Sequence, residues 1–165
     1  MRASIGRMPI EIRPEPPRRP DIEELLRLSD EFAFALYPAE SCYLLDVGEL
    51  EKPGVTVFVA RVDGRALGIA ALVIDQVAPS RAELKRMFVH EDARGQGLAR
   101  RLLAEIEAAA VEAGVAELRL ETGPLQHAAI ALYERSGYDR IPNFGGYVGD
   151  PYSVCYAKPL AVAAH

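Results

Sequence analysis

The sequence predicts one domain of the mixed α/β (α+β) class, in which an antiparallel meander is followed by a strand–helix–strand unit. Three observations support this prediction. The dipeptide Asp63-Gly64, between two apolar stretches, is a strong signal for a tight hairpin turn. Near residue 98 the spacing of apolar residues changes from that of a strand to that of a helix. A length of 165 residues suits a single hydrophobic core, so we expect residues 1–165 to form one domain.

The first part of the chain predicts a short strand, a stiff connector and a helix. Residues 10–13 suit a strand, whereas the proline-rich stretch 14–20 cannot be helical. Residues 21–36 then follow helical spacing, and Asp21 with Glu24 resembles an N-terminal capping box. The expected buried stripe of this helix is Ile22, Leu25, Leu26, Ala33 and Leu36.

The rest of the chain predicts five strands and two helices. After a stretch without clean periodicity at 39–54, the strands are expected at 55–60, 66–74, 83–89, 118–121 and 153–158. A long helix at 98–113 follows the third of these strands, and Gly114 is placed to end it. Its expected apolar face is Leu98, Leu102, Ile106, Ala109 and Ala113. A further helix ends near Gly137.

Composition and charge narrow the class of protein. The net charge of −5 argues against a general nucleic-acid-binding protein and fits a cationic amine substrate better than an anionic one. The N-terminus lacks the apolar run of a signal peptide, and no stretch reaches transmembrane length, so we expect a cytoplasmic protein without a membrane partner. Cys42 and Cys155 are far apart and in no metal spacing, which favours two free thiols.

The turn before the long helix, at 94–99, has the features of an anion site. The start of a helix offers unpaired backbone N–H groups and a partial positive charge. Gly95 and Gly97 carry no Cβ, so a ligand can approach the backbone closely. Three arginines flank or occupy the first helical turn, where each cation is disfavoured by roughly 0.3–1 kcal/mol. They are Arg94, Arg100 and Arg101. We interpret the turn as a phosphate site; the alternative is an ordinary turn with solvated arginines.

Two well-known phosphate motifs fit this turn less well. The P-loop string G-x-x-x-x-G-K-[ST] does not occur in the sequence. In the dinucleotide fingerprint G-x-G-x-x-G, Arg100 would replace the third glycine, and five residues separate the strand from the first glycine. Glu121 does end the next strand, where that fingerprint needs an acidic residue, so a dinucleotide site stays open as the weaker alternative.

Two motifs, in order, resemble those of one family. The string R-G-Q-G-L-A at 94–99 is similar to the Q/R-x-x-G-x-G/A motif of the GNAT superfamily of N-acetyltransferases. Residues 126–138, QHAAIALYERSGY, resemble the family's A-I-x-L-Y-E-x-x-G-F/Y segment, with Gln126 where the family often has Asn. The resemblance implies a GNAT-like fold: a central mixed, mostly antiparallel sheet with two splayed parallel central strands, flanked by helices.

The resemblance implies acetyl-CoA as cosubstrate and no metal. The pyrophosphate is expected on backbone N–H groups of Arg94, Gly95, Gln96, Gly97, Leu98 and Ala99. The pantetheine arm is expected to run like an extra strand beside Met87, Phe88 and Val89. The thioester would enter between the strands at 83–89 and 118–121. Gln126 is expected to contact the cofactor as well, because of its place in the second motif.

The resemblance also suggests two catalytic residues. Tyr133 matches the tyrosine that the family places beside the CoA sulfur. Because a phenol (pKa about 10) is a weaker acid than a thiol (about 8.5), full proton transfer would be uphill by roughly 2 kcal/mol, so we expect hydrogen bonding to matter as much. Glu83 stands where histone-acetyltransferase members carry a catalytic glutamate and is the candidate general base. An ion pair with Lys85, on the same strand face, is the structural alternative.

Three residues are candidates for the acceptor pocket. Tyr37 and Glu40 lie in the early helical region that borders this pocket in the family. Tyr147 belongs to the glycine- and aromatic-rich segment 141–152, which could form a wall of the pocket. The structural alternatives are helix-end packing for Tyr37 and a solvated carboxylate for Glu40, which the sequence favours, and a turn that packs its aromatic residues onto the sheet for Tyr147. His90 and His127 lack partner ligands at metal spacing, so no metal site is expected at either, and His165 gives no basis for a prediction.

The sequence therefore predicts an N-acetyltransferase that moves an acetyl group from acetyl-CoA to a primary amine of a small molecule or peptide. No suitably paired nucleophile for an acyl-enzyme is visible, which favours direct attack in a ternary complex. The alternative is a non-catalytic acyl-CoA-binding sensor or scaffold of the same fold. A homodimer, common in the family, is compatible with the sequence.

Overall fold

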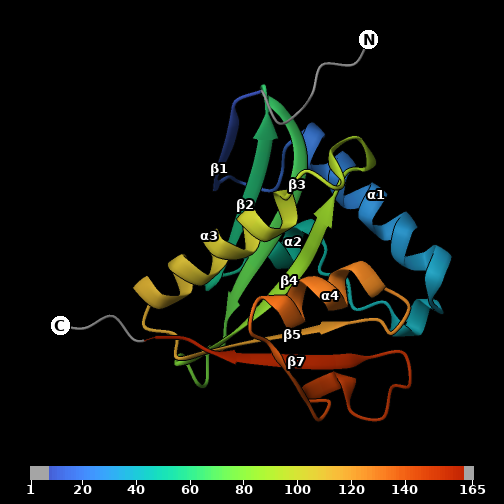
Figure 1. The fold of residues 1–165 in the computed structure, drawn as a ribbon, viewed down its shortest axis with the longest axis vertical. Helices are drawn as coiled ribbons and strands as arrows, with labels where there is room; N and C mark the ends of the chain where they lie inside the picture. Colours follow the sequence, from blue (N-terminus) through green and yellow to red (C-terminus); the bar gives the residue numbers. More distant parts are fainter. Residues whose placement is uncertain (1–7, 162–165) are drawn as a thin grey trace.

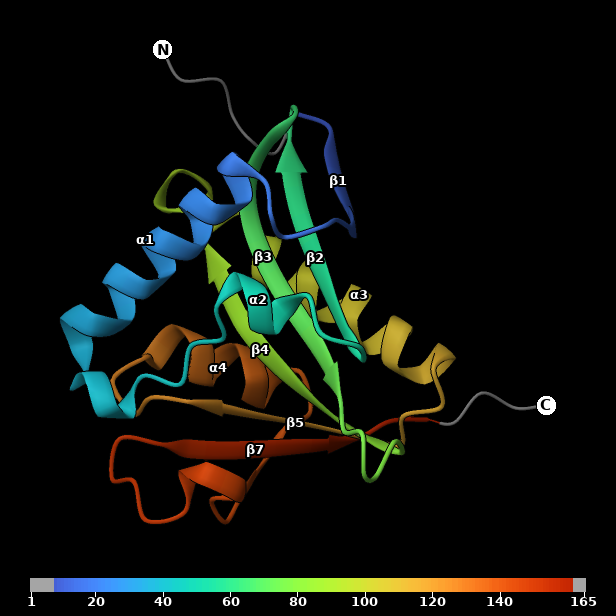
Figure 2. The ribbon, with the colours of Figure 1, turned by 180° about the vertical axis from the view of Figure 1, so that it is seen from behind.

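A computed structural model describes residues 8–161, which form a seven-stranded sheet between two layers of helices (Figures 1 and 2). The strand order is β1-β2-β3-β4-β5-β7-β6. The strands are β1 (Ile10–Pro14), β2 (Val55–Val62), β3 (Arg65–Ile74), β4 (Arg81–Val89), β5 (Glu117–Thr122), β6 (Asp139–Ile141) and β7 (Val154–Pro159). The α-helices are α1 (Pro20–Leu36), α2 (Val47–Leu50), α3 (Leu98–Glu112) and α4 (His127–Arg135). Short 3₁₀ turns are η2 (Ala39–Ser41), η3 (Glu91–Ala93) and η4 (Gly145–Tyr147). His165 and residues 1–7 lie outside the described residues.

The two helical layers cover opposite faces of the sheet. Figure 1 shows α3 and α4 in front of the strands, and Figure 2, from behind, shows α1 and α2 on the other face. The first layer buries the larger core, in which α3 contributes Leu98, Leu102 and Ile106. The second layer packs Ile22 and Leu25 of α1 against the sheet. Each helix is held mainly by the burial of its apolar face, as is usual for amphipathic helices.

The two central strands separate, as the sequence resemblance implied. All neighbouring strands are antiparallel except β4 and β5, which are parallel. Their pairing covers only Arg81–Leu84 of β4 and Glu117–Leu120 of β5, although β4 continues to Val89. Figure 1 shows the two strands diverging beyond this paired region. The unpaired part of β4 therefore borders an opening in the middle of the sheet.

A bulge in β4 accompanies this opening. The register between β3 and β4 shifts between Ile69 and Ala71, and Arg86 has a positive φ of 59°. Non-glycine residues in the left-handed region are uncommon and need compensating contacts. Arg86 has them: its guanidinium donates to the Asp30 carboxylate at 2.7 Å and to the Leu26 carbonyl at 3.0 Å. The side chain is only 1% exposed, so it ties the bulge to α1.

We expect Arg86→Met to lower the free energy of unfolding by about 2 kcal/mol, because it removes two charge-assisted hydrogen bonds and leaves Asp30 without its cation. Asp30 is 41% exposed, which keeps the loss below that of a fully buried pair. Urea unfolding measures the change. The control is Arg27→Met, on α1, whose side chain is 54% exposed and whose loss should cost under about 0.5 kcal/mol. Equal effects of the two substitutions would contradict a structural role for Arg86.

Most predicted elements are confirmed, including the hairpin at Asp63-Gly64, which joins β2 and β3, and the helix end before Gly114. Three details were wrong. Asp21 does not cap α1, which begins at Pro20; its carboxylate instead accepts a hydrogen bond from Arg61 at 2.7 Å. The buried face of α3 ends at Ala110 rather than Ala113. The helix α2 and the strand β6 were not predicted. Within the described residues, no helix is long and apolar enough to cross a membrane.

Candidate active site

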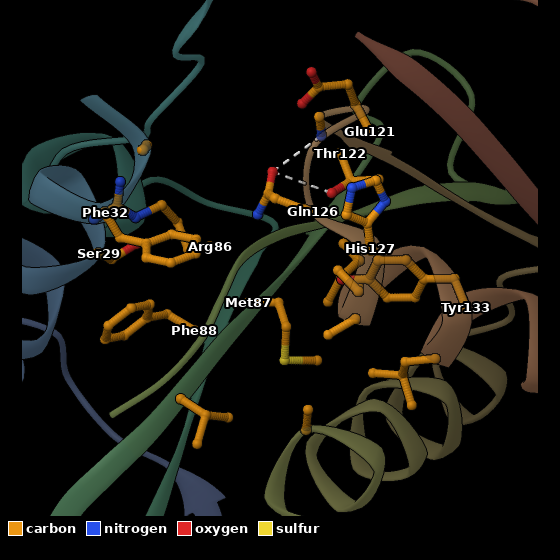
Figure 3. Close-up of a pocket in the computed structure, with 18 of the residues that line it drawn as sticks. Ser29, Phe32, Arg86, Met87, Phe88, Glu121, Thr122, Gln126, His127 and Tyr133 are labelled. Atoms are coloured by element: carbon orange, nitrogen blue, oxygen red, sulfur yellow. Dashed lines mark hydrogen bonds between the residues drawn. The ribbon is translucent and has the colours of Figure 1, made fainter. Parts of the chain in front are cut away.

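A cavity of about 1240 Å³ lies at the opening between β4 and β5. One wall is the β4 stretch from Leu84 to Val89, and another is formed by α4 with the loop before it. In Figure 3, Met87 and Phe88 of β4 lie opposite His127 and Tyr133 of α4. The start of α3 closes one end of this cavity, which we call the central cleft. The cleft thus joins a helix N-terminus to the gap in the sheet.

The start of α3 has free backbone donors. Its N-cap is Gly97, in the left-handed region with φ of 80°, and no side chain of the described residues caps it. Gly95 is also left-handed, with φ of 77°. A Cβ added at Gly95 would meet no atom within 4 Å, and one at Gly97 would meet only the Arg100 guanidinium at 3.9 Å. The loop therefore presents orphan N–H groups to open space, as an anion site requires.

Arg94 is fixed beside this loop. Its Nε donates to the Val89 carbonyl at 3.2 Å, and its guanidinium lies 5.3 Å and 5.8 Å from the ring centroids of Phe32 and Phe88. Such contacts orient the planar group while leaving its terminal nitrogens available. Of the three arginines predicted to serve an anion, Arg94 and Arg100 line the cleft.

The segment between β5 and α4 is held by three hydrogen bonds that involve side chains. The Gln126 Oε1 accepts hydrogen bonds from the Gly123 N–H at 3.0 Å and from the Thr122 hydroxyl at 3.3 Å (dashed lines in Figure 3). The Tyr37 hydroxyl accepts one from the Leu125 N–H at 3.1 Å. A Cβ at Gly123 would lie 2.0 Å from the Tyr37 ring, so this close approach requires glycine. Gln126 and Tyr37 both line the central cleft.

Tyr133 is buried in the wall of the cleft. Its ring packs edge-on against Tyr138, with centroids 5.9 Å apart. Burial, and secondarily the nearby Glu121, raise the pKa of the Tyr133 phenol. Among residues 8–161 its hydroxyl has no hydrogen-bond partner, so its donor and acceptor capacity is not used by the chain itself.

A second cavity of about 730 Å³ adjoins the central cleft and shares Cys42, Tyr43, Leu44 and Lys85 with its lining. Glu83 lies here, and its carboxylate accepts a hydrogen bond of 2.5 Å from the Tyr147 hydroxyl. Lys85 Nζ lies 2.7 Å from the same hydroxyl and 3.7 Å from the Glu83 carboxylate. Burial, then the charge of Glu83 and its hydrogen bond, raise the pKa of the Tyr147 phenol. We call this region the side cavity.

The wall of the side cavity is fastened by Asp150. Its carboxylate accepts hydrogen bonds from the Tyr43 hydroxyl at 2.6 Å and the Ser41 hydroxyl at 3.2 Å. The first of these contacts raises the pKa of Tyr43 to about 12, because ionisation would place a second negative charge beside the carboxylate. The segment after α1 is thereby tied to the loop between β6 and β7.

Comparison with known proteins assigns this architecture to a family. Residues 19–138 match the model of the acetyltransferase (GNAT) family. The chain belongs to the GNAT acetyltransferase family. An IAA acetyltransferase from Azospirillum brasilense is 44% identical to it over 147 residues, covering 88% of this chain and 95% of that protein.

Solved structures agree with the GNAT assignment. A Klebsiella pneumoniae protein assigned as an acyl-CoA N-acyltransferase has a TM-score of 0.77 at 34% identity, covering 92% of this chain and 98% of that one. A paia N-acetyltransferase from Thermoplasma acidophilum, solved in complex with coenzyme A, has a TM-score of 0.70 at 21% identity, covering 92% of this chain and 99% of that one. At that identity the second likeness shows the GNAT fold alone.

The site residues predicted from the sequence do not all line the same cavity of this GNAT protein. Those predicted to contact the cofactor all line the central cleft, together with Tyr133 and Tyr37: Met87, Phe88, Val89, Arg94, Gly95, Gln96, Gly97, Leu98, Ala99 and Gln126. Glu83 and Tyr147 line the side cavity instead. Glu40 is exposed and lines neither cavity. His90 Nδ1 accepts a hydrogen bond from the Asp92 N–H, and no group of three metal-binding side chains occurs among residues 8–161.

Glu121 is a cleft residue that sequence reasoning considered only as a ribose contact of a dinucleotide site. It lies on β5, lines the central cleft with Tyr133, and accepts a hydrogen bond of 2.7 Å from the Ser153 hydroxyl. Burial is the main cause that raises the pKa of its carboxyl. The alternation of residues along the strand is the sequence signal for Glu121, because it places the carboxylate of Glu121 on the same face of β5 as the guanidinium of Arg119.

Proposed function

We propose that this GNAT protein transfers an acetyl group from acetyl-CoA to a primary amine. The observation that carries the proposal is the central cleft, which connects the uncapped start of α3 to the Tyr133 hydroxyl through the gap between β4 and β5. The N–H groups and arginines at one end suit a diphosphate, and the gap suits a narrow thioester arm. The relative named as an acetyltransferase supports the acetyl group as the one transferred.

Transfer requires a neutral amine, a polarised carbonyl and a stabilised thiolate. The amine nitrogen attacks the thioester carbon, a C–N bond forms, and the C–S bond breaks to release CoA thiolate. A backbone N–H near Val89 stabilises the developing charge on the carbonyl oxygen. Tyr133 donates to the sulfur. Because burial raises its pKa, the phenol acts mainly as a hydrogen-bond donor, and the thiolate takes its proton from solvent.

Two carboxylates are candidates for accepting the proton of the amine. Glu121 lines the same cavity as Tyr133, so we assign it the direct role. Glu83 reaches the cleft through Tyr147 and Lys85, which suits a relay. In both cases the base would lie on the sheet face that carries α1.

We expect Glu121→Gln to remove the acid limb of the pH profile of kcat/KM and to raise the melting temperature at pH 7–8. A carboxyl whose folded pKa is raised contributes stability at low pH that is lost as pH rises through the folded value, so the neutral amide gains only above the ordinary pKa of about 4.3. The melting advantage should therefore shrink as pH falls towards 4. Glu83→Gln is the matched variant. If Glu83→Gln alone flattens the profile, Glu83 is the base; if neither does, both assignments fail.

The function itself is tested by following CoA thiol release from acetyl-CoA over a panel of primary amines. The proposal predicts release that depends on the added amine, with formation of the N-acetyl product. A non-catalytic acyl-CoA sensor would instead bind acetyl-CoA, measured by calorimetry, without amine-dependent release. Absence of both binding and release would overturn the proposal.

A further inference from the structure

The side cavity contains an arginine that the proposed chemistry does not use. Arg119 of β5 lies directly beside Glu83 of β4 in the parallel register. Because residues alternate along a strand, Arg81, Glu83 and Lys85 share the face of β4 that Arg119 and Glu121 share on β5. The two central strands therefore present adjacent charged side chains on the same face of the sheet, and all of these except Glu121 line the side cavity.

Arg119 is held in one orientation. Its Nε donates to the Glu117 carboxylate at 2.5 Å, and its guanidinium lies 5.2 Å from the ring centroid of Phe144. The side chain is 24% exposed. These contacts use one edge and one face of the guanidinium, and its two terminal nitrogens have no hydrogen-bond partner among residues 8–161. A guanidinium fixed in this way is prepared for a planar anion, with little rotamer freedom left to lose.

The other charged groups of the side cavity are engaged. Arg81 pairs with Asp75 at 3.3 Å. Lys85 and Glu83 both contact the Tyr147 hydroxyl. Glu49 accepts a hydrogen bond from the Asp46 N–H in the cap of α2. Arg81 also keeps nitrogens without a partner among residues 8–161, but its side chain is 39% exposed, whereas Arg119 is 24% exposed and lies against the Phe144 ring. A ligand of the side cavity would therefore best place a negative charge at Arg119.

The remaining walls of the side cavity are aromatic. The rings of Tyr43 and Phe144 stand edge-on to Tyr147, with centroids 4.8 Å and 5.2 Å from it. Leu44, Leu45 and Val73 add aliphatic surface. Such a lining suits a flat or apolar body, with polar groups only at defined points.

We propose that the acyl acceptor is a primary amine that also bears a carboxylate, and that Arg119 binds this carboxylate. The inference rests on the proposed function and names the substrate class of the same site. Arg119 lies two residues before Glu121 on β5, a separation of about 6–7 Å along the strand. The carboxylate would lie in the side cavity while the amine reaches the central cleft, with the body of the substrate against the aromatic wall.

Matched amines that differ only in the carboxylate test this proposal. Suitable pairs are phenylalanine with phenethylamine and para-(aminomethyl)benzoate with benzylamine, each assayed by CoA release. We expect at least one acid to be preferred over its partner about tenfold or more in kcat/KM, as for a charge-assisted contact. In Arg119→Gln this preference should fall to about one, while the KM for acetyl-CoA stays unchanged. Arg140→Gln, an exposed arginine on β6 outside both cavities, is the charge-matched control and should retain the preference.

The outcomes separate the inference from the proposed function. Equal use of the members of both pairs, or a preference that survives in Arg119→Gln, overturns the carboxylate site and leaves the acetyltransferase assignment intact. If no amine supports CoA release, the proposed function fails, and calorimetric binding of the same pairs to the CoA-saturated protein decides the inference. There, tighter binding of an acid that disappears in Arg119→Gln supports the site, and equal binding overturns it.

Discussion

Tyr133→Phe is expected to lower kcat about 100-fold while changing the KM for acetyl-CoA less than threefold. The hydroxyl is the donor in the buried wall of the cleft, and its loss removes a hydrogen bond to a charge that develops only as the C–S bond breaks. The ring, which packs against Tyr138, is retained, so substrate binding should be nearly unaffected. Steady-state kinetics with varied acetyl-CoA at a saturating amine measures both constants.

Tyr138→Phe is the matched control for this substitution. It removes the same atom from the neighbouring ring, whose hydroxyl donates to Glu107 at 2.7 Å and does not line the cleft. We expect a loss of about 1 kcal/mol in the free energy of unfolding, with kcat within about twofold of the wild-type value. If Tyr133→Phe turns over as fast as Tyr138→Phe, the assigned role of Tyr133 is refuted.

Gly97→Ala is expected to raise the KM for acetyl-CoA at least tenfold with little change in kcat at saturation. The N-cap glycine has φ of 80°, where an L-residue costs roughly 1–2 kcal/mol, so the loop must shift or strain. The added methyl group would also enter the open space beside the free N–H groups. Both effects should lower the affinity for the diphosphate, and neither changes the residues around the reacting thioester. Calorimetric titration with acetyl-CoA gives the same comparison without turnover.

Gly114→Ala controls for strain in the backbone. Gly114 follows the other end of α3, with φ of 84° and no atom within 4 Å of an added Cβ. It should destabilise the fold about as much as Gly97→Ala and leave the KM for acetyl-CoA unchanged. A similar rise in KM for both variants would attribute the effect to the helix as a whole rather than to its N-terminus.

The sequence predicted the elements whose periodicity is local. The strands on either side of Asp63-Gly64 and the helix after Gly97 follow from turn chemistry and from a change of hydrophobic period. Predictions from local sequence were wrong where a side chain bonds to a residue far away in the sequence. Asp21 is a residue type that often caps helix N-termini, yet its carboxylate accepts a hydrogen bond from Arg61, 40 positions away in the sequence. The four-residue helix α2 is too short to show a period.

The division of the candidate site into two cavities could not be predicted from the sequence. Glu83 and Tyr133 both lie in recognised motifs, but Tyr133 lines the central cleft, whereas Glu83 lines the side cavity and bonds to Tyr147, 64 positions away in the sequence. Tyr147 is positioned by a short 3₁₀ turn, and Asn143 donates to its carbonyl at 3.0 Å. Such loop geometry has no periodic signature. The orientation of Arg119 likewise depends on Phe144 of the same segment, whose placement only the three-dimensional structure gives.

The most direct test of diphosphate binding at the start of α3 follows the backbone amide resonances of the protein during titration with acetyl-CoA. Binding at the start of α3 predicts large, saturable shifts for the amides of residues 95–100, where the diphosphate would lie, with further shifts along residues 87–89, where the pantetheine arm would run. A spectrum unchanged by acetyl-CoA, or shifts clustered away from the start of α3, would contradict it.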